Sequence, residues 1–298
     1  MNNSEAFFHL PGLFEFYEFY KVFLPLFYKR RELFYDWAEI SSVYGAPGGC
    51  IWGGGRVGSG NARTRDVLAL MGEYGISSRL TFSNSLLLPE HLSDGHCNGL
   101  CEMFAAGNKK NGIIVHSELL LSYLKEKYPS LYFVSSTTKA LTDFNELKNE
   151  LDREDFRFVV PDFRLNKEFG KLNTLSESQK NKLEFLCNEC CFYECNERKA
   201  CYENVSRKNL GENCPDHVCP HTCEHGYRFS QAMKNPAFIS AEDIRGLYLP
   251  NGFSNFKIEG RELGSALLLE FILYYLTRPE CRLEVREEIY LDNTLDLF

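Results

Sequence analysis

Short apolar segments alternate with amphipathic ones along the chain, and this rhythm constrains the fold more than any other feature. Runs rich in aromatic and β-branched residues predict seven strands near residues 40, 80, 114, 133, 159, 185 and 257, with an eighth near Ala237 to Ser240. The segments between most of these strands predict helices. Strands joined by helices pair in parallel, because the helix returns the chain to the same end of the sheet.

Eight such units fit the size of a (β/α)8 barrel, which takes about 250 residues. The sequence has 298 residues, with no internal repeat and no low-complexity linker. We therefore expect one TIM-like barrel domain over residues 1–298, with an open doubly wound sheet as the alternative. Residues 13–37 place aromatic side chains three and four positions apart, which predicts a core-facing helix interrupted near Pro25.

Composition narrows the classes of protein to consider. The chain is 44% hydrophobic, enough for a sizeable core. Its net charge of −8 disfavours nucleic-acid binding through the overall charge of the protein. Binding through a local basic groove is the alternative. The first residues have no basic region and no small-residue cleavage site, and the sequence has no run of about 18 uncharged apolar residues. We expect no signal peptide, no membrane span and a cytoplasmic location.

Eight of the twelve cysteines lie between Cys187 and Cys223. They are Cys187, Cys190, Cys191, Cys195, Cys201, Cys214, Cys219 and Cys223, with His217, His221 and His225 interleaved. Thiolates bind soft and borderline metals, and short spacings let neighbouring cysteines reach one ion or cluster. A disulfide framework is typical of small secreted domains, and a hydrophobic core does not need so many thiols. The segment therefore predicts a metal-binding or iron–sulfur insertion at residues 187–225.

In a (β/α)8 barrel, working residues follow the carboxyl ends of the strands. The insertion would fill the long loop after the sixth predicted strand and place its metal at the barrel mouth. The other strand-end residues form a candidate set: Tyr44 to Arg56, Ser83, Asn84, His116, Ser117, Ser136 to Lys139, Asp162, Arg164, Asn166, Asn188 to Cys195, Lys257, Glu259 and Arg261.

Three segments resemble motifs of the peptidase U32 family. LEFLCNECCFYECNERKACYENVSR is similar to the family pattern L-x-N-x-x-C-x-x-x-C-P-x-R-x-x-H-Y, NPAFISAEDI to F-I-R-P-E-D, and FSNFKIEGRE to K-I-E-G-R. The likeness covers residues from about 40 to 280. It implies a (β/α)8 barrel with a cysteine-bound [4Fe–4S] cluster. It also implies an oxygen-independent hydroxylation chemistry, whose family substrates include transfer RNA, ribosomal RNA and a quinone precursor.

Aligned on this pattern, the resemblance implies ligands at Cys191 and Cys195, with Asn188 and Arg198 at the motif asparagine and arginine. Asn196 replaces the usual proline and Cys201 the usual histidine. For the remaining ligands we favour Cys219 and Cys223, whose spacing repeats that of the first pair. Four further cysteines are alternates, for this cluster or for a second site with His217 or His221: Cys187, Cys190, Cys201 and Cys214.

Zinc is the competing metal, since Cys187 and Cys190 have a zinc-knuckle spacing and four thiolates suit either metal. The C-x3-C-x2-C spacing of radical S-adenosylmethionine enzymes is absent. We find no serine-protease or H-E-x-x-H signature, so peptidase activity is not expected.

The predicted function is an iron–sulfur oxidoreductase or hydroxylase-like enzyme. The alternative is a zinc-stabilised structural or partner-binding module without catalysis. Its substrate would be a small molecule, a peptide or RNA, and a redox partner is expected. The residues expected to hold substrate are Arg56, Asn84, Lys257, Glu259 and Arg261. For the last three, which alternate along one strand, an ion-pair network that supports the barrel is the competing interpretation. The glycine-rich segment IWGGGRVGSGN is either an anion-binding loop or a plain turn.

Overall fold

The computed structural model describes residues 5–55, 60, 62–107, 110–221, 228–260 and 263–291. Eight parallel strands form one sheet in the order β6-β5-β4-β3-β2-β1-β8-β7. The strands are β1 (Ala6–Pro11), β2 (Ala38–Gly45), β3 (Ser77–Phe82), β4 (Gly112–Val115), β5 (Tyr132–Ser135), β6 (Phe156–Val159), β7 (Glu184–Leu186) and β8 (Asn255–Lys257).

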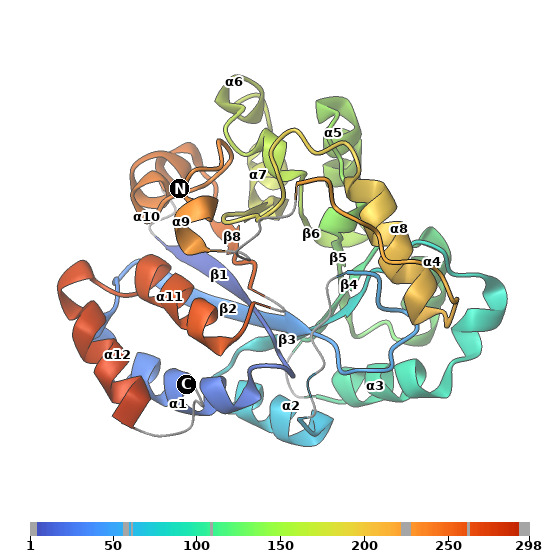
Figure 1. Ribbon diagram of the computed structural model, residues 1–298, viewed down its shortest axis with the longest axis horizontal. Coiled ribbons are helices and arrows are strands. Elements are labelled where there is room, and N and C mark those ends of the chain that lie inside the picture. Colours follow the sequence, from blue (N-terminus) through green and yellow to red (C-terminus); the bar gives the residue numbers. More distant parts are fainter. Residues whose placement is uncertain are drawn as a thin grey trace.

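The sheet curls into a nearly closed barrel, as expected. Its two edge strands, β6 and β7, meet through a parallel bridge between Val159 and Leu183. Helices surround the barrel (Figure 1). They are α1 (Tyr17–Lys29), α2 (Thr64–Glu73), α3 (Gly95–Ala105), α4 (Glu118–Lys127), α5 (Phe144–Asp152), α6 (Phe169–Leu172), α7 (Glu177–Lys182), α8 (Arg198–Asn209), α9 (Phe229–Ala232), α10 (Ala241–Asp243), α11 (Ser265–Tyr275) and α12 (Arg282–Leu291).

All seven strands predicted from their apolar runs are present, but the expected eighth strand is wrong. Residues 237–240 form neither helix nor strand, and β1 (Ala6–Pro11) takes the missing place between β2 and β8. Strand β1 could not be recognised from the sequence, because its apolar residues continue directly into the aromatic pattern of α1. The cysteine segment consequently follows β7, the seventh strand, rather than the sixth.

The helix expected over residues 13–37 is shorter than predicted and is not interrupted at Pro25. Helix α1 spans Tyr17–Lys29 with Pro25 inside it. Its buried rings, including Phe19, Phe23 and Phe27, pack against each other and against the core, which offsets the hydrogen bond that the proline removes.

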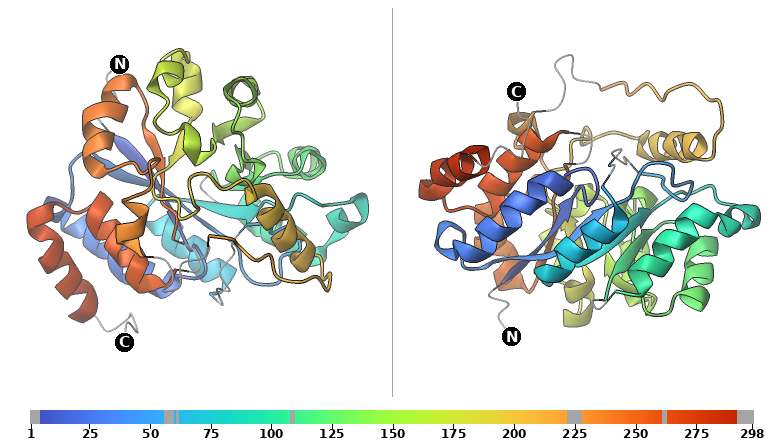
Figure 2. Two further views of the ribbon diagram at one scale, coloured as in Figure 1. Left: turned by 45° about the horizontal axis from the view of Figure 1, so that its top comes forward. Right: turned by 90° about the horizontal axis from the view of Figure 1, so that it is seen from below.

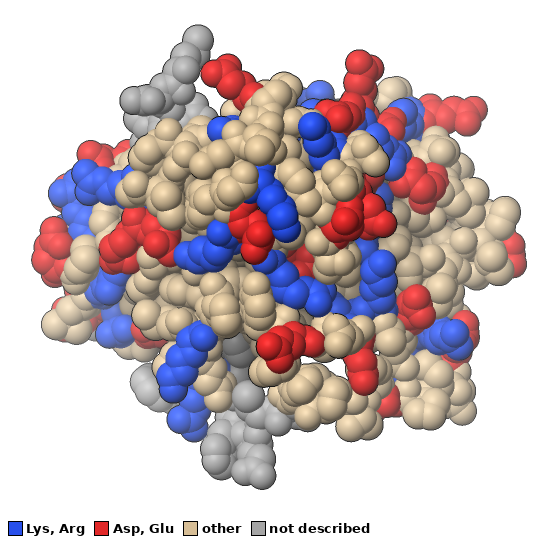
Figure 3. Space-filling view, turned by 90° about the horizontal axis from the view of Figure 1, so that it is seen from above, with Lys and Arg blue, Asp and Glu red and all other residues tan. Residues whose placement is uncertain are grey.

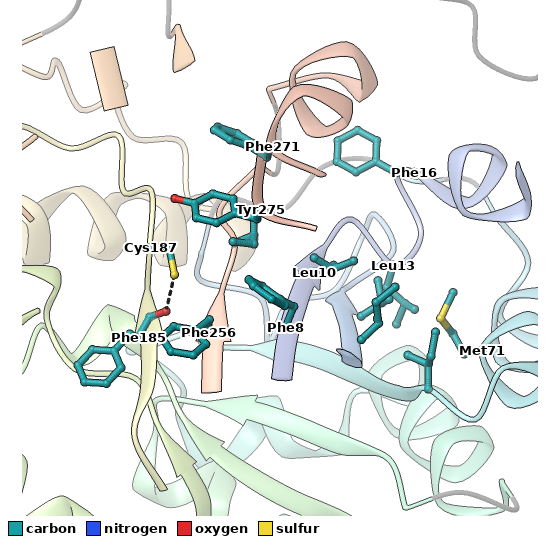
Figure 4. Packing of buried hydrophobic residues seen from close by; sticks show 14 of the residues in the cluster. Phe8, Leu10, Leu13, Phe16, Met71, Phe185, Cys187, Phe256, Phe271 and Tyr275 are labelled. Atoms are coloured by element: carbon teal, nitrogen blue, oxygen red, sulfur yellow. Dashed lines mark hydrogen bonds between the residues drawn. The ribbon is translucent and has the colours of Figure 1, made fainter. Parts of the chain in front are cut away.

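Two apolar layers hold the barrel together. The outer layer lies between sheet and helices and includes Phe8, Phe185 and Phe256 from the strands with Phe271 and Tyr275 from α11 (Figure 4). A smaller cluster fills the interior and contains Tyr44, Ile114, Tyr132, Val134, Phe158, Val160 and Leu186. Alternate residues of each strand thus face the two layers, as the period of two requires.

No helix in the described ranges has the length and apolar character needed to span a bilayer. On the outer face drawn in Figure 3, Lys and Arg are interspersed with Asp and Glu. This face therefore lacks the broad basic surface that would bind nucleic acid by charge alone.

Candidate metal centre at the barrel mouth

The cysteine segment leaves β7 and lies over the carboxyl ends of the strands. In the right-hand view of Figure 2, α8 and the extended chain after it lie across one end of the barrel. This position confirms the general placement expected for the segment, although it follows β7.

An ion network holds the start of the segment. Arg198 is 3% exposed and donates to Asp162 Oδ2 at 2.7 Å and to Glu189 Oε2 at 2.5 Å. The other oxygen of Glu189 accepts the backbone N–H groups of Cys190 at 2.9 Å and Cys191 at 3.1 Å. The motif arginine thus acts through Glu189 on the backbone that presents two thiols.

Two more contacts fix the same turn. Asn235, the first residue of the second motif, donates to the carbonyl oxygen of Cys191 at 3.0 Å. Arg164 donates to the carbonyl oxygen of Cys195 at 3.2 Å and pairs with Asp162 at 2.7 Å. Burial opposes ionisation of Asp162, but bonds from Arg164 and the charge of Arg198 lower its pKa. The backbone from residue 190 to residue 195 is therefore held from three sides.

Asn188, the motif asparagine, ties β7 to β8. Its amide donates to the carbonyl oxygen of Glu259 at 2.9 Å and accepts the N–H of Glu259 at 2.8 Å. This reciprocal pair fixes where the cysteine segment leaves the barrel.

The cysteines differ in their surroundings. Cys187 is fully buried in the outer core, where its thiol donates to the Phe185 carbonyl oxygen at 3.6 Å (Figure 4). Burial raises the pKa of this thiol well above its ordinary value. Its surroundings suit a small apolar residue better than a metal ligand. Cys195 is 8% exposed, and a further group is half-buried: Cys190, Cys191, Cys201, Cys214 and Cys219.

The turn presents the thiols of Cys190, Cys191 and Cys195, which are donors of the kind that bind iron–sulfur clusters and zinc. The two guanidinium groups beside the turn are paired with carboxylates, Arg198 with Asp162 and Glu189 and Arg164 with Asp162. Within the described ranges, no three His, Cys, Asp or Glu side chains meet in a metal-binding arrangement. Cys223, one of the four expected ligands, lies outside those ranges.

A cavity of about 350 Å³ opens beside the turn. Its walls include Cys190, Cys191 and Phe192 on one side and Gln231 and Asn235 on the other. The Phe192 ring, 47% exposed, stacks on His221 with 4.2 Å between ring centroids. The cavity thus gives a ligand a route to two of the clustered cysteines.

A second charged group lies inside the barrel. Glu184 accepts from Arg79 at 2.5 Å and lies 3.6 Å from Lys257 Nζ and from His9 Nε2. Burial opposes ionisation of Glu184, but the charges of Arg79 and Lys257 outweigh it and lower its pKa to about 2. Burial, with the Arg79 charge, lowers the pKa of His9 to about 3, so this imidazole is neutral at pH 7.

This interior network bears on the strand of the third motif. Lys257 points inward as expected, with Nζ 3.7 Å from the centroid of the Tyr44 ring, while Phe256 and Ile258 belong to the outer layer. Its pairing with buried Glu184 matches the alternative of a supporting ion-pair network. Glu259 is 5% exposed, and its backbone bonds to Asn188. Arg261 lies outside the described residues.

Asn84 has a connecting position. Its amide donates to the carbonyl oxygens of Ile51 at 2.8 Å and Ser206 at 3.1 Å, and its oxygen accepts the N–H of Leu86 at 2.9 Å. The side chain joins β3 to the preceding loop and to α8. Arg56, expected beside it, lies outside the described residues.

The glycine-rich segment is explained in part by close packing. A Cβ atom at Gly54 would lie 2.3 Å from the carbonyl oxygen of Ser83, and one at Gly60 would lie 2.2 Å from the Phe14 carbonyl carbon. Only glycine lets the chain approach these backbones.

Arg79, Glu184 and His9 were missed as members of the interior network. A signal was present in β3 and β7, where Arg79 and Glu184 are charges inside apolar strands. Glu189 was in the candidate range Asn188 to Cys195, but its pairing with Arg198 carried no signal, because a carboxylate among cysteines resembles any polar loop residue.

Comparisons with known proteins support the fold. No family model matches the chain, and no curated protein matches it in sequence. The solved structure of the U32 peptidase Mk0906 matches with a TM-score of 0.50 and 14% identity, over 85% of this chain and 92% of that one. The U32-like barrel implied by the three motifs is thus found in the structure, at the level of fold.

Proposed function

We propose that the chain is a U32-like iron–sulfur protein that binds a [4Fe–4S] cluster through Cys191, Cys195, Cys219 and Cys223. The observation that supports this proposal most directly is that the turn from residue 190 to residue 195 has a fixed backbone. Glu189, Asn235 and Arg164 fix the backbone that carries the thiols of Cys190, Cys191 and Cys195. The U32-like fold and the three sequence motifs support it.

A bound cluster would supply one-electron redox chemistry. Arg198 would hold this part of the site through Glu189, and Arg164 through the carbonyl oxygen of Cys195. The cavity beside Cys190 and Cys191 gives a substrate access to that end of the site. The reaction class that we propose is an oxidoreductase or hydroxylase-like step on a small molecule, a peptide or RNA, supported by a redox partner in the cytoplasm. Peptidase activity is not part of the proposal.

A zinc-stabilised module without catalysis is the second candidate. Residues 212–219 form neither helix nor strand, and His217 in this stretch lies 3.3 Å from the carboxylate of Glu197, the residue before α8. A zinc ion bound by the surrounding thiols would order such a segment.

Anaerobic purification of the full chain separates the two candidates. A brown protein that absorbs at about 400 nm and contains iron and acid-labile sulfide supports the cluster. A colourless protein that contains zinc supports the module, and a protein without either metal contradicts both.

A further inference from the structure

Helix α8 docks on the barrel through a polar face. Its buried residues are Arg198, Tyr202 and Ser206, which recur every four positions and so share one side of the helix. None of the residues 198–209 belongs to the apolar core cluster. Most helices of a globular protein are held by an apolar face. Hydrogen bonds and the buried ring of Tyr202 hold α8, and water can replace the hydrogen bonds when the helix lifts.

The helix crosses the mouth of the barrel from β6 to β2. At its amino end, Arg198 binds Asp162 after β6 and donates to Thr137 Oγ1 after β5 at 3.1 Å. Towards its carboxyl end, Asn84 after β3 donates to the Ser206 carbonyl oxygen at 3.1 Å, and the N–H of Ser85 donates to Ser206 Oγ at 3.2 Å, the bond that alanine at 206 removes. Asn209 donates to the Gly53 carbonyl oxygen, in the loop after β2, at 2.8 Å.

The two ends are held with different strength. Buried Arg198 makes charge-assisted bonds to Glu189 and Asp162, which are roughly twice as strong as neutral ones. The carboxyl end has neutral hydrogen bonds, which water can replace, and one apolar contact, that of the half-buried capping residue Leu210 with the core cluster. This asymmetry places the hinge beside the cysteine turn and the opening above β2 and β3.

We propose that α8 is a lid that pivots about Arg198 and uncovers the mouth of the barrel above Asn84 and Gly53. Closed, it buries the ends of strands where (β/α)8 barrels bind substrates. The movement itself depends only on the contacts of α8. That the lid admits the substrate of the thiolate site rests on the proposed function.

Amide hydrogen exchange of the full chain tests the movement. In the wild type, we expect residues 199–209 to exchange at least about a hundredfold faster than β4 and β5, because a helix of this length frays in water once it leaves the barrel and so opens its internal hydrogen bonds. Ser206→Ala with Asn209→Ala should speed exchange in α8 about tenfold and leave the strands unchanged. Alanine is intrinsically the better helix former, so faster exchange would report lost docking.

The control is Glu203→Ala with Lys208→Ala, which changes two exposed positions of the same helix and should not speed its exchange. The lid is overturned if α8 exchanges only at the rate of the sheet, if the docking variant behaves like the control, or if the variant speeds α8 and the strands equally.

The amide of Ser85, in the loop after β3, reports the uncovering of the mouth, because its N–H donates to Ser206 Oγ at 3.2 Å. Asn209→Ala alone leaves this bond available in the closed state and should speed exchange of the Ser85 amide about tenfold, together with that of α8. An unchanged rate at Ser85 would overturn the gating. Metal content is measured on the same samples. If the protein binds metal but α8 does not move, the lid is contradicted and the proposed function is not. If α8 moves but the protein binds no metal, the proposed function is contradicted and the lid is not.

Discussion

The two charged networks show how single residues in this barrel serve structure and site. Arg198 and Asn188 could be singled out from sequence because they occupy motif positions, and their partners were among the strand-end candidates, but which residue pairs with which could not be predicted. Glu189 lies next to the cysteines in sequence, whereas Asp162 reaches Arg198 only after the strand ends are brought together. These two residues are 36 positions apart in sequence, and a sequence pattern does not show that the barrel brings them into contact.

At the thiols, Cys191→Ser or Cys195→Ser should each remove most of the bound iron. Serine is a poor ligand for iron in a thiolate site, and both residues belong to the fixed turn. Iron and sulfide per chain are the measurement. Cys281→Ser, a half-buried position in the short helix Pro279–Cys281, is the matched control and should keep its iron. Wild-type iron in both turn variants would refute the ligand assignment.

Acid should destabilise the protein through His9. Burial lowers its pKa from 6.5 to about 3, so between these values the unfolded chain binds a proton that the folded chain does not. His9 therefore does not reduce the free energy of unfolding above pH 6.5. Below that pH, the free energy of unfolding falls by about 1.4 kcal/mol per pH unit because of this group. His116, with a pKa lowered by burial to about 4, contributes in the same direction.

Urea unfolding of His9→Gln between pH 6.5 and pH 4.5 checks this. In this variant, the free energy of unfolding should fall less steeply with decreasing pH, because the unfolded chain takes up about one proton fewer. The exposed control His96→Gln should keep the wild-type slope. An equal slope in wild type and His9→Gln would show that His9 is protonated in the folded barrel.

At the scale of elements, Arg198 joins α8, the cysteine turn and the loop after β6. Arg198→Met would leave the carboxylates of Asp162 and Glu189 buried without their shared partner. Removing one member of a buried ion pair costs about 3–5 kcal/mol, and we expect a loss of stability of that size in urea unfolding. Arg207→Met, on the exposed side of α8, should change stability by about 0–1 kcal/mol. Equal losses in the two variants would contradict the network.

Element prediction succeeded where apolar periodicity was local and failed where neighbouring segments merged. The seven strands found from sequence are short apolar runs separated by polar helices. Strand β1 was missed because Ala6–Pro11 continues into the aromatic residues of α1, so no polar boundary marks its end. The placement of α8 could not be predicted either, since a helix with a polar buried face has no apolar stripe.

At the scale of the whole molecule, the barrel and the cysteine segment are held by different means. The barrel has an outer apolar layer and an inner one, and neither includes the half-buried cysteines of the mouth. Of the seven clustered cysteines that the structure describes, only Cys187 belongs to the outer core. Losing a metal at the mouth should therefore affect the segment far more than the barrel.

Chelation of the metal under anaerobic conditions tests this separation. We expect the thermal midpoint of the barrel to fall by no more than a few degrees, which corresponds to about 1 kcal/mol for a chain of this size. Protease cleavage between residues 195 and 221 should become much faster, since a thiolate-bound metal orders the chain that supplies its ligands.

After chelation and denaturation, nearly all twelve cysteines should react as free thiols. Several stable disulfides would overturn both the metal site and the cytoplasmic location, whereas free thiols with an unchanged cleavage rate would show that the segment is ordered by its protein contacts alone.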